Sequence, residues 1–240
     1  MPINKAFFIT RLQNRIFYKK TYKTNGEAVL VKNMRKYDAS KNPKFNYPLQ
    51  KETKKHYFLP ILSQYHTRLF PDLYLKNEII KVNSQIENPC GYAIEKIYVT
   101  NVKFISALPG DIVCVYRMGE AYKSFTSVVS GIGIVQEINY PTSLEDYLNN
   151  CKNKSVFSEV ELRNFYCNKE YRTIIKILFL ERFEHKVILK KLYENDIIEI
   201  GSGPRIFDYI SDDNYKTILE LGEGNLWKRI LLFQLIQNMF

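Results

Sequence analysis

Runs of β-branched and apolar residues, separated by short polar turns, dominate the middle of the chain. Residues 111–117 (DIVCVYR) and 127–138 (SVVSGIGIVQEI) are apolar on both faces, which predicts two buried strands. Residues 93–105 and 172–183 have the same character and predict two more. Glycine inside a strand marks a bulge, a tight bend or the close approach of another backbone. The segment GIGIV therefore predicts a strand that coils strongly.

Helices are indicated by capping residues at the start of shorter amphipathic segments. Ser143 precedes LEDYLNN and Ser211 precedes DDNYKTILEL, so both are expected as N-caps. Ser158 and Glu161 have the spacing of a capping box. Residues 188–196 predict a short helix or turn.

The N-terminal quarter of the chain has a different pattern. Residues 5–10 and 27–33 predict a pair of short strands, and residues 35–55, with two prolines and many lysines, predict a linker. Pro60 is expected in the first turn of a helix that ends before Pro71. Strands with short helices between them, without regular βαβ alternation, predict an α+β fold on a curved antiparallel sheet.

Charge is distributed unevenly along the 240 residues. The net charge is +10, and residues 1–60 contain 14 Lys and Arg residues but only 3 acidic residues. This asymmetry favours an anionic partner, most commonly nucleic acid, with a solvated lysine-rich surface as the alternative. We expect phosphate contacts in the basic arm, at Arg11, Arg15, Lys19, Lys20 and Lys23.

Other features narrow the class of protein. No apolar run approaches the ~20 residues of a membrane span, and the N-terminus is too charged for a signal peptide. The four cysteines form no Cys-x-x-Cys pair and the three histidines are far apart in sequence. We therefore expect no disulfide framework, no metal site and no cofactor, and predict a cytoplasmic protein without membrane attachment.

Four segments in order, PGDIVCVYR, YKSFTSVVSGIGIVQEI, CKNKSVFSEVEL and IIKILFLERF, resemble the PUA-like superfamily, in particular the EVE- and ASCH-type domains of bacteria. The resemblance runs from about Tyr65 to about Leu221 and implies a curved β-barrel with peripheral short helices. It extends to bacterial proteins in which such a domain follows an acetyltransferase-type domain, of which residues 1–33 would be a remnant. Acetyl transfer is not expected, because no glycine-rich turn opens a helix for the coenzyme A pyrophosphate.

The resemblance implies a nucleic-acid-binding protein that holds RNA, or a modified or flipped base, in the barrel mouth without catalysis of its own. A small ASCH-type hydrolase or nuclease is one alternative, and a structural subunit docking on a protein partner is another. The predicted division is a basic arm with a strand pair and linker (1–58), a PUA-like domain (59–222) and an apolar C-terminal helix (223–240). The wide apolar arc of residues 225–240 predicts either a helix packed in a groove of its own barrel or a contact with a second copy or a protein partner.

The stretch YRMGEAYKSFTS and the strand after it supply the candidate site. A pocket for a base needs flat apolar faces for stacking and a few polar groups for the base edge. Aromatic rings, cationic groups and hydroxyls of this kind are present at Tyr116, Arg117, Tyr122, Lys123, Thr126, Ser127 and Ser130. Phe125 is a further stacking face, unless it and Tyr116 simply fill the core.

Several other side chains are weaker candidates. Lys96 and Tyr98 could line the same mouth or belong to an ordinary half-buried strand. Asp111 is expected to cap its turn rather than to act as an acid. An enzyme would need a base such as His66 or Glu137, but Glu137 lies ten residues beyond Ser127, about 30 Å along an extended strand.

Overall fold

The structure, a computed structural model, describes residues 19–24, 27–31, 37–75, 89–152 and 154–222. The chain divides into two compact units, Met1–Lys51 and Glu52–Phe240. The predicted strand at 5–10 and the apolar helix at 225–240 lie outside the described residues, as do Arg11 and Arg15.

The first unit contains an antiparallel strand pair and one helical turn. Strand β1 (Lys19–Thr24) pairs with β2 (Glu27–Val31), and α1 (Pro43–Asn46) follows within the predicted linker. The strand predicted at 27–33 is therefore present, but its partner is a segment that we expected to be a connection. The sequence Asn25-Gly26 between the two strands is the missed signal, because Asn-Gly favours the tight turn of a hairpin.

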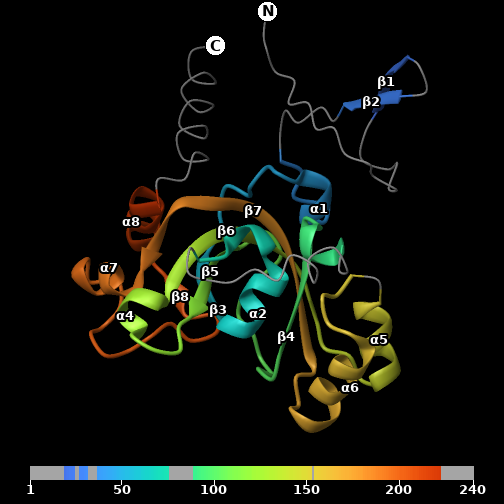
Figure 1. The fold of residues 1–240 in the computed structure, drawn as a ribbon. Helices are drawn as coiled ribbons and strands as arrows, with labels where there is room; N and C mark the ends of the chain where they lie inside the picture. Colours follow the sequence, from blue (N-terminus) through green and yellow to red (C-terminus); the bar gives the residue numbers. More distant parts are fainter. Residues whose placement is uncertain (1–18, 25–26, 32–36, 76–88, 153, 223–240) are drawn as a thin grey trace, which may run out of the picture. The chain divides into compact units, whose positions relative to one another are not determined.

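The second unit is built on one six-stranded sheet with the order β4-β7-β6-β5-β3-β8 (Figure 1). Its strands are β3 (His56–Leu62), β4 (Glu95–Thr100), β5 (Ile112–Met118), β6 (Val128–Asn139), β7 (Thr173–Ile188) and β8 (Tyr209–Ile210). The predicted α+β class is confirmed.

The sheet is mixed rather than purely antiparallel, and its ladder is open. Strands β3 and β5 pair in parallel, which the long connection between them permits. The edge strands β4 and β8 do not pair with each other. The sheet nevertheless curls enough that the hydroxyl of Tyr98 in β4 reaches the carbonyl oxygen of Pro60 in β3 and donates to it at 3.1 Å.

The two glycines of β6 lie where β7 crosses closely over it. A Cβ at Gly131 would lie 2.5 Å from the carbonyl oxygen of Glu181, and one at Gly133 would lie 2.6 Å from Cγ2 of Ile177. The β6–β7 register also shifts at both places, as in β-bulges. The prediction of close backbone approach at GIGIV is confirmed, and Figure 1 shows β7 arching over the sheet.

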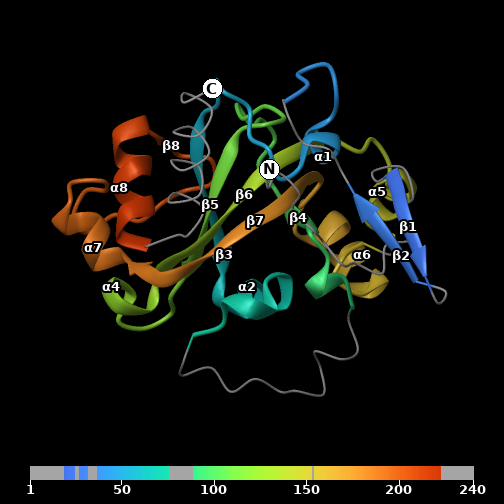
Figure 2. The same cartoon turned by 90° about the horizontal axis from the view of Figure 1, so that it is seen from above.

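Short helices lie on two sides of the sheet, with α5 and α6 on the β4 side and α4, α7 and α8 on the other (Figure 2). Their bounds are α2 (Ser63–Leu69), α4 (Lys123–Thr126), α5 (Leu144–Cys151), α6 (Glu159–Asn168), α7 (Leu189–Glu194) and α8 (Asp212–Gly222), with 3-10 turns at Pro71–Leu73 and Pro89–Tyr92. The predicted caps at Ser143 and Ser211 and the capping box of Ser158 and Glu161 are all formed.

The helix predicted from Pro60 begins three residues later than expected. Pro60 lies inside β3, and the helix α2 starts at Ser63. Strand β8 pairs with β3 only at His56 and Tyr57. At Pro60 no strand therefore lies on that side of β3 to accept a backbone N–H, so the missing N–H of proline is tolerated.

Candidate functional site

A pocket of about 300 Å³ opens at the carboxyl ends of β3, β4 and β5. Five aromatic side chains line it, contributed by α2, β4, α6 and the segments that flank α6: Tyr65, Tyr98, Phe157, Phe165 and Tyr171. Aliphatic side chains, Thr100, Asn101 and Arg205 complete the lining. A pocket of this size is at the small end of those that bind organic ligands.

The aromatic wall is fixed by contacts between its own rings. The Tyr65 ring is edge-on to Phe157 at 5.4 Å and to Phe165 at 5.9 Å between ring centres, and Phe157 and Phe165 are 5.1 Å apart. Tyr171 packs on Phe165 at 5.7 Å. Edge-to-face pairs of this kind hold each ring in one orientation, so the wall is formed before any ligand arrives.

The Tyr98 side chain reaches from β4 to β3 along the pocket. Its hydroxyl donates to the Pro60 carbonyl oxygen, and both residues line the pocket. Burial raises the pKa of Tyr98, so the phenol is neutral at physiological pH. Its neighbour Lys96 does not line the pocket. That ammonium donates to the carbonyl oxygen of Gly91, and burial lowers the pKa of Lys96 to about 8.

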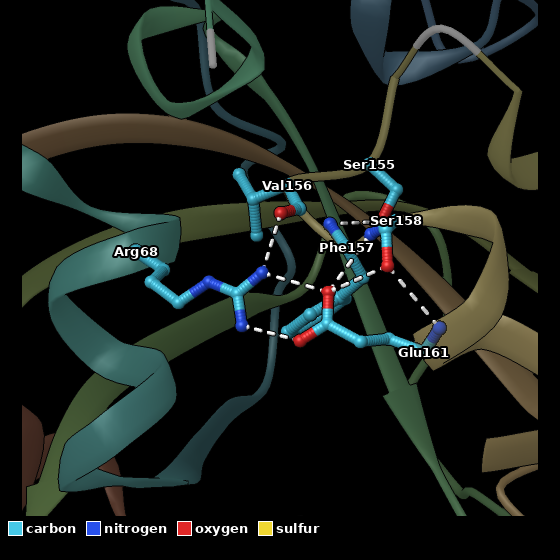
Figure 3. A network of polar contacts seen from close by, with 6 residues as sticks. All are labelled: Arg68, Ser155, Val156, Phe157, Ser158 and Glu161. Atoms are coloured by element: carbon cyan, nitrogen blue, oxygen red, sulfur yellow. Dashed lines mark hydrogen bonds and ion pairs between the residues drawn. The ribbon is translucent and has the colours of Figure 1, made fainter. Parts of the chain in front are cut away.

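An ion pair joins α2 to α6 beside the aromatic wall (Figure 3). The Arg68 guanidinium donates to both carboxylate oxygens of Glu161, at 2.7 and 3.0 Å, and to the carbonyl oxygen of Val156 at 2.9 Å. It also lies 5.0 Å from the ring centre of Phe157. The hydrogen bond from Arg68, more than any other interaction, lowers the pKa of Glu161 to about 2. The Glu161 carboxylate also accepts from the Ser158 N–H at 2.9 Å, which closes the capping box.

Arg205 is the one charged residue among the described residues that line the pocket. Its side chain is exposed, and among the described residues its guanidinium has no hydrogen-bond or ion-pair partner. The segment is held beside β3 because the Phe58 N–H donates to the Asp208 carbonyl oxygen at 2.9 Å and the Phe207 N–H donates to the Phe58 carbonyl oxygen at 3.0 Å. Among the described residues, the pocket therefore presents one unpaired cation beside rings that pack edge to face on one another.

A second, shallower hollow of about 390 Å³ adjoins the pocket. The two share Leu62 and Met118, and the second is otherwise lined by the start of α2 and by the loop that follows β5. Of the seven residues predicted for the base-binding site, Lys123 lines this hollow. Within it, the Ser63 hydroxyl donates to the Glu120 carboxylate.

The other predicted residues do not gather in the pocket. Tyr116 is buried and packs edge-on against Phe58, at 6.3 Å between ring centres. Arg117, Thr126 and Ser127 are engaged in hydrogen bonds within the loop between β5 and β6. Tyr122 is 85% exposed.

The candidate bases for an enzyme do not open onto either hollow. His66 Nε2 lies 2.9 Å from the Ser130 hydroxyl, and both side chains are fully buried. Burial, helped by the nearby charges of Arg117 and Lys186, lowers the pKa of His66 to about 3. Glu137 accepts from Lys176 at 3.0 Å on the neighbouring strand. Asp111, as expected, caps its turn by accepting from the Leu108 N–H, and its other carboxylate oxygen accepts from the Lys55 N–H just before β3.

Across the part of the chain that the structure describes, no group of three or more His, Cys, Asp or Glu side chains could hold a metal ion. No helix within those same residues is long and apolar enough to cross a membrane.

No family model and no curated protein matches the sequence, but solved structures are similar in fold. A mutant ASCH protein from Zymomonas mobilis has 9% identity and a TM-score of 0.47, over 70% of this chain and 96% of its own. Human THYN1 in complex with 5-methylcytosine-containing DNA has 11% identity and a TM-score of 0.39, over 71% and 98%. The YTH domain of the Zygosaccharomyces rouxii MRB1 protein in complex with N6-methyladenosine RNA has 12% identity and a TM-score of 0.34, over 73% and 88%.

An ASCH protein is thus among the similar structures. At identities this low the similarity concerns the arrangement of strands and helices. The ligand has to be inferred from the residues of the pocket.

Proposed function

We propose that the protein binds nucleic acid by holding one unpaired or flipped base in the aromatic pocket. The observation that carries the proposal is a preformed pocket of about 300 Å³ with aromatic walls and an unpaired arginine among its lining residues. Flat rings that stack on a base, beside a cation for its phosphate, are the usual means of holding a single nucleotide.

Each part of the lining has a role in this proposal. The rings of Tyr65, Phe157 and Tyr171 offer apolar faces or edges to the base. Thr100 and Asn101 offer hydrogen bonds to its edge, and Arg205 pairs with a neighbouring phosphate. No catalysis is proposed, since the buried His66 and Ser130 cannot reach a bound base.

The experiment is a titration of labelled nine-nucleotide single strands by fluorescence anisotropy. The similar structures suggest which probes to use first: DNA with and without one central 5-methylcytosine, and RNA with and without one N6-methyladenosine. Asn101→Trp places a large ring in the pocket from an exposed position and should abolish binding. Ser106→Trp, at an exposed position that does not line the pocket, is the matched control.

Arg205→Ala should weaken binding and reduce the slope of log K against log salt by about 0.7–0.9, the contribution of one phosphate contact. Lys216→Ala removes the same charge from an exposed position on α8 and should leave the slope nearly unchanged. If wild-type protein binds none of the four probes, or if Asn101→Trp binds as well as Ser106→Trp, the pocket is not a base-binding site.

A further inference from the structure

The loop between β5 and β6 is fixed by hydrogen bonds within itself and to the end of β5. Arg117 Nη1 donates to the carbonyl oxygen of Thr126 at 3.0 Å, and the Gly119 N–H donates to Ser127 Oγ at 2.9 Å. The Thr126 hydroxyl donates to the carbonyl oxygen of Ala121 at 2.5 Å. A Cβ at Gly119 would lie only 2.0 Å from Thr126 Oγ1, so the loop packs tightly on itself.

This fixed loop exposes aromatic rings. The side chains of Tyr122 and Phe125 are 85% and 58% exposed. Tyr122 has left-handed backbone angles, φ 48° and ψ 49°, which are rare for a bulky residue. Lys123 lies between the two rings in sequence, and Lys190 Nζ lies 5.6 Å from the ring centre of Phe125. We call Tyr122, Lys123 and Phe125 the aromatic platform.

One residue of the aromatic platform, Lys123, lines the hollow that adjoins the pocket. Leu62 and Met118, both partly exposed, line the pocket on one side and the second hollow on the other. The second hollow in turn extends to Lys123. A chain that leaves the pocket over Leu62 and Met118 therefore reaches Lys123, which stands next to Tyr122 in sequence.

We propose that the aromatic platform binds the nucleotides next to the one in the pocket, so that the protein holds a single-stranded segment rather than an isolated base. Bases stack on exposed aromatic rings with little dependence on sequence, and Lys123 supplies a charge for a phosphate. Because hydrogen bonds already fix the loop, it loses little conformational entropy when a ligand binds. The Glu120 carboxylate lies in the same hollow, so the phosphate is expected at the Lys123 end.

The inference rests on the proposed function and is tested with two ligands of different length, using the full chain. One is the mononucleotide 5-methyl-dCMP, and the other is a thymidine pentamer with a central 5-methylcytosine. The platform variant combines two substitutions, Tyr122→Asn and Phe125→Ala. Asparagine lacks the ring but tolerates the left-handed backbone angles of position 122. Tyr140→Ala, at a half-exposed ring beyond the opposite end of β6, is the control.

The platform variant should bind the pentamer roughly 5- to 100-fold more weakly than wild type, and the mononucleotide equally well. Lys123→Ala alone should reduce the slope of log K against log salt for the pentamer by about 0.7. The melting temperature of the protein should not change. Equal pentamer affinity in the platform variant and in Tyr140→Ala overturns the inference, and the proposed function stands if Asn101→Trp still abolishes binding. Equal losses for both ligands overturn it too, since the platform would then act through the pocket. If wild-type protein binds neither ligand, the inference fails, and the proposed function fails with it if none of the four nine-nucleotide probes binds either.

Discussion

Removing the charge of Glu161 should loosen the join between α2 and α6 without uncapping α6. In Glu161→Gln the amide oxygen can still accept from the Ser158 N–H, because glutamine serves at this position of a capping box. What is lost is the bidentate ion pair with Arg68, which also holds the guanidinium over Phe157. The substitution therefore perturbs one wall of the pocket through a single interaction.

The size of the effect follows from the geometry and the exposure of the pair. A fall in the pKa of Glu161 from 4.5 to about 2 corresponds to about 3 kcal/mol if it is taken at full value. The two side chains are 40% and 35% exposed, however, so solvent screening reduces this figure. Since bidentate pairs are about twice as strong as simple ones, we expect a loss of about 1–2 kcal/mol in the free energy of unfolding.

The assay is urea unfolding at several pH values, with Glu159→Gln as the control. The control breaks the ion pair between Glu159 and Arg163 on the same helix, whose side chains are 67% and 51% exposed. Losing this pair should lower the free energy of unfolding by about 0.5 kcal/mol or less. The pKa of Glu161 is depressed by folding, so the stabilisation is complete above about pH 4.5 and is lost as the pH falls towards 2. The difference between wild type and Glu161→Gln should shrink over that range.

Two results would refute this reasoning. If Glu161→Gln is no less stable at pH 7 than Glu159→Gln, the pair contributes no more than an ordinary surface ion pair. If the difference from wild type is the same at pH 3 as at pH 7, the charge of Glu161 is not its source.

Three further predictions follow from the fold. Gly133→Ala should lower the free energy of unfolding by about 1–3 kcal/mol because its Cβ would overlap Ile177, whereas Gly203→Ala, with only one atom within 4 Å at 3.9 Å, should have a much smaller effect in the same urea titration. Folding lowers the pKa of His66 from 6.5 to about 3, so stability should fall by up to about 1.4 kcal/mol per pH unit as the pH drops from 6.5 to 3; a His66→Phe variant with an unchanged pH profile would contradict this. Replacing the three lysines of β1 by glutamine should reduce the salt slope of nucleic-acid binding by about 2, and an unchanged slope would show that this part of the basic arm does not contact phosphate.

Features written locally in the sequence could be predicted, and features that depend on distant partners could not. The caps at Ser143 and Ser211 and the GIGIV crossing follow from residues within one segment, and all are present. The parallel pairing of β3 with β5 depends on a connection of about 50 residues and left no local signal. The strand position of Pro60 follows from how short β8 is, and that is set far along the chain.

The same distinction applies to the site. The sequence places hydroxyls and cations around residues 116–130, but only the fold shows that Arg117 and Ser127 point into their own loop while Lys123 lines a hollow. Arg205 reaches the pocket because its segment lies beside Phe58, nearly 150 residues earlier. The aromatic wall was missed because Tyr65 and Phe165 each look like an ordinary apolar position of a helix.

The strand order has a consequence for how the protein is made. Strand β3 leaves the ribosome before both of its neighbours in the sheet, β5 and β8. Until β5 has been synthesised, β3 has no strand to pair with, and β8 follows β5 only after about 90 further residues. Pairings between segments so far apart form slowly, and an unpaired strand is prone to join another chain. A nascent chain that stalls before residue 209 would lack β8 and leave the edge of β3 unpaired at His56 and Tyr57 as well as beyond them, so we expect prematurely terminated chains to aggregate more readily than the full chain.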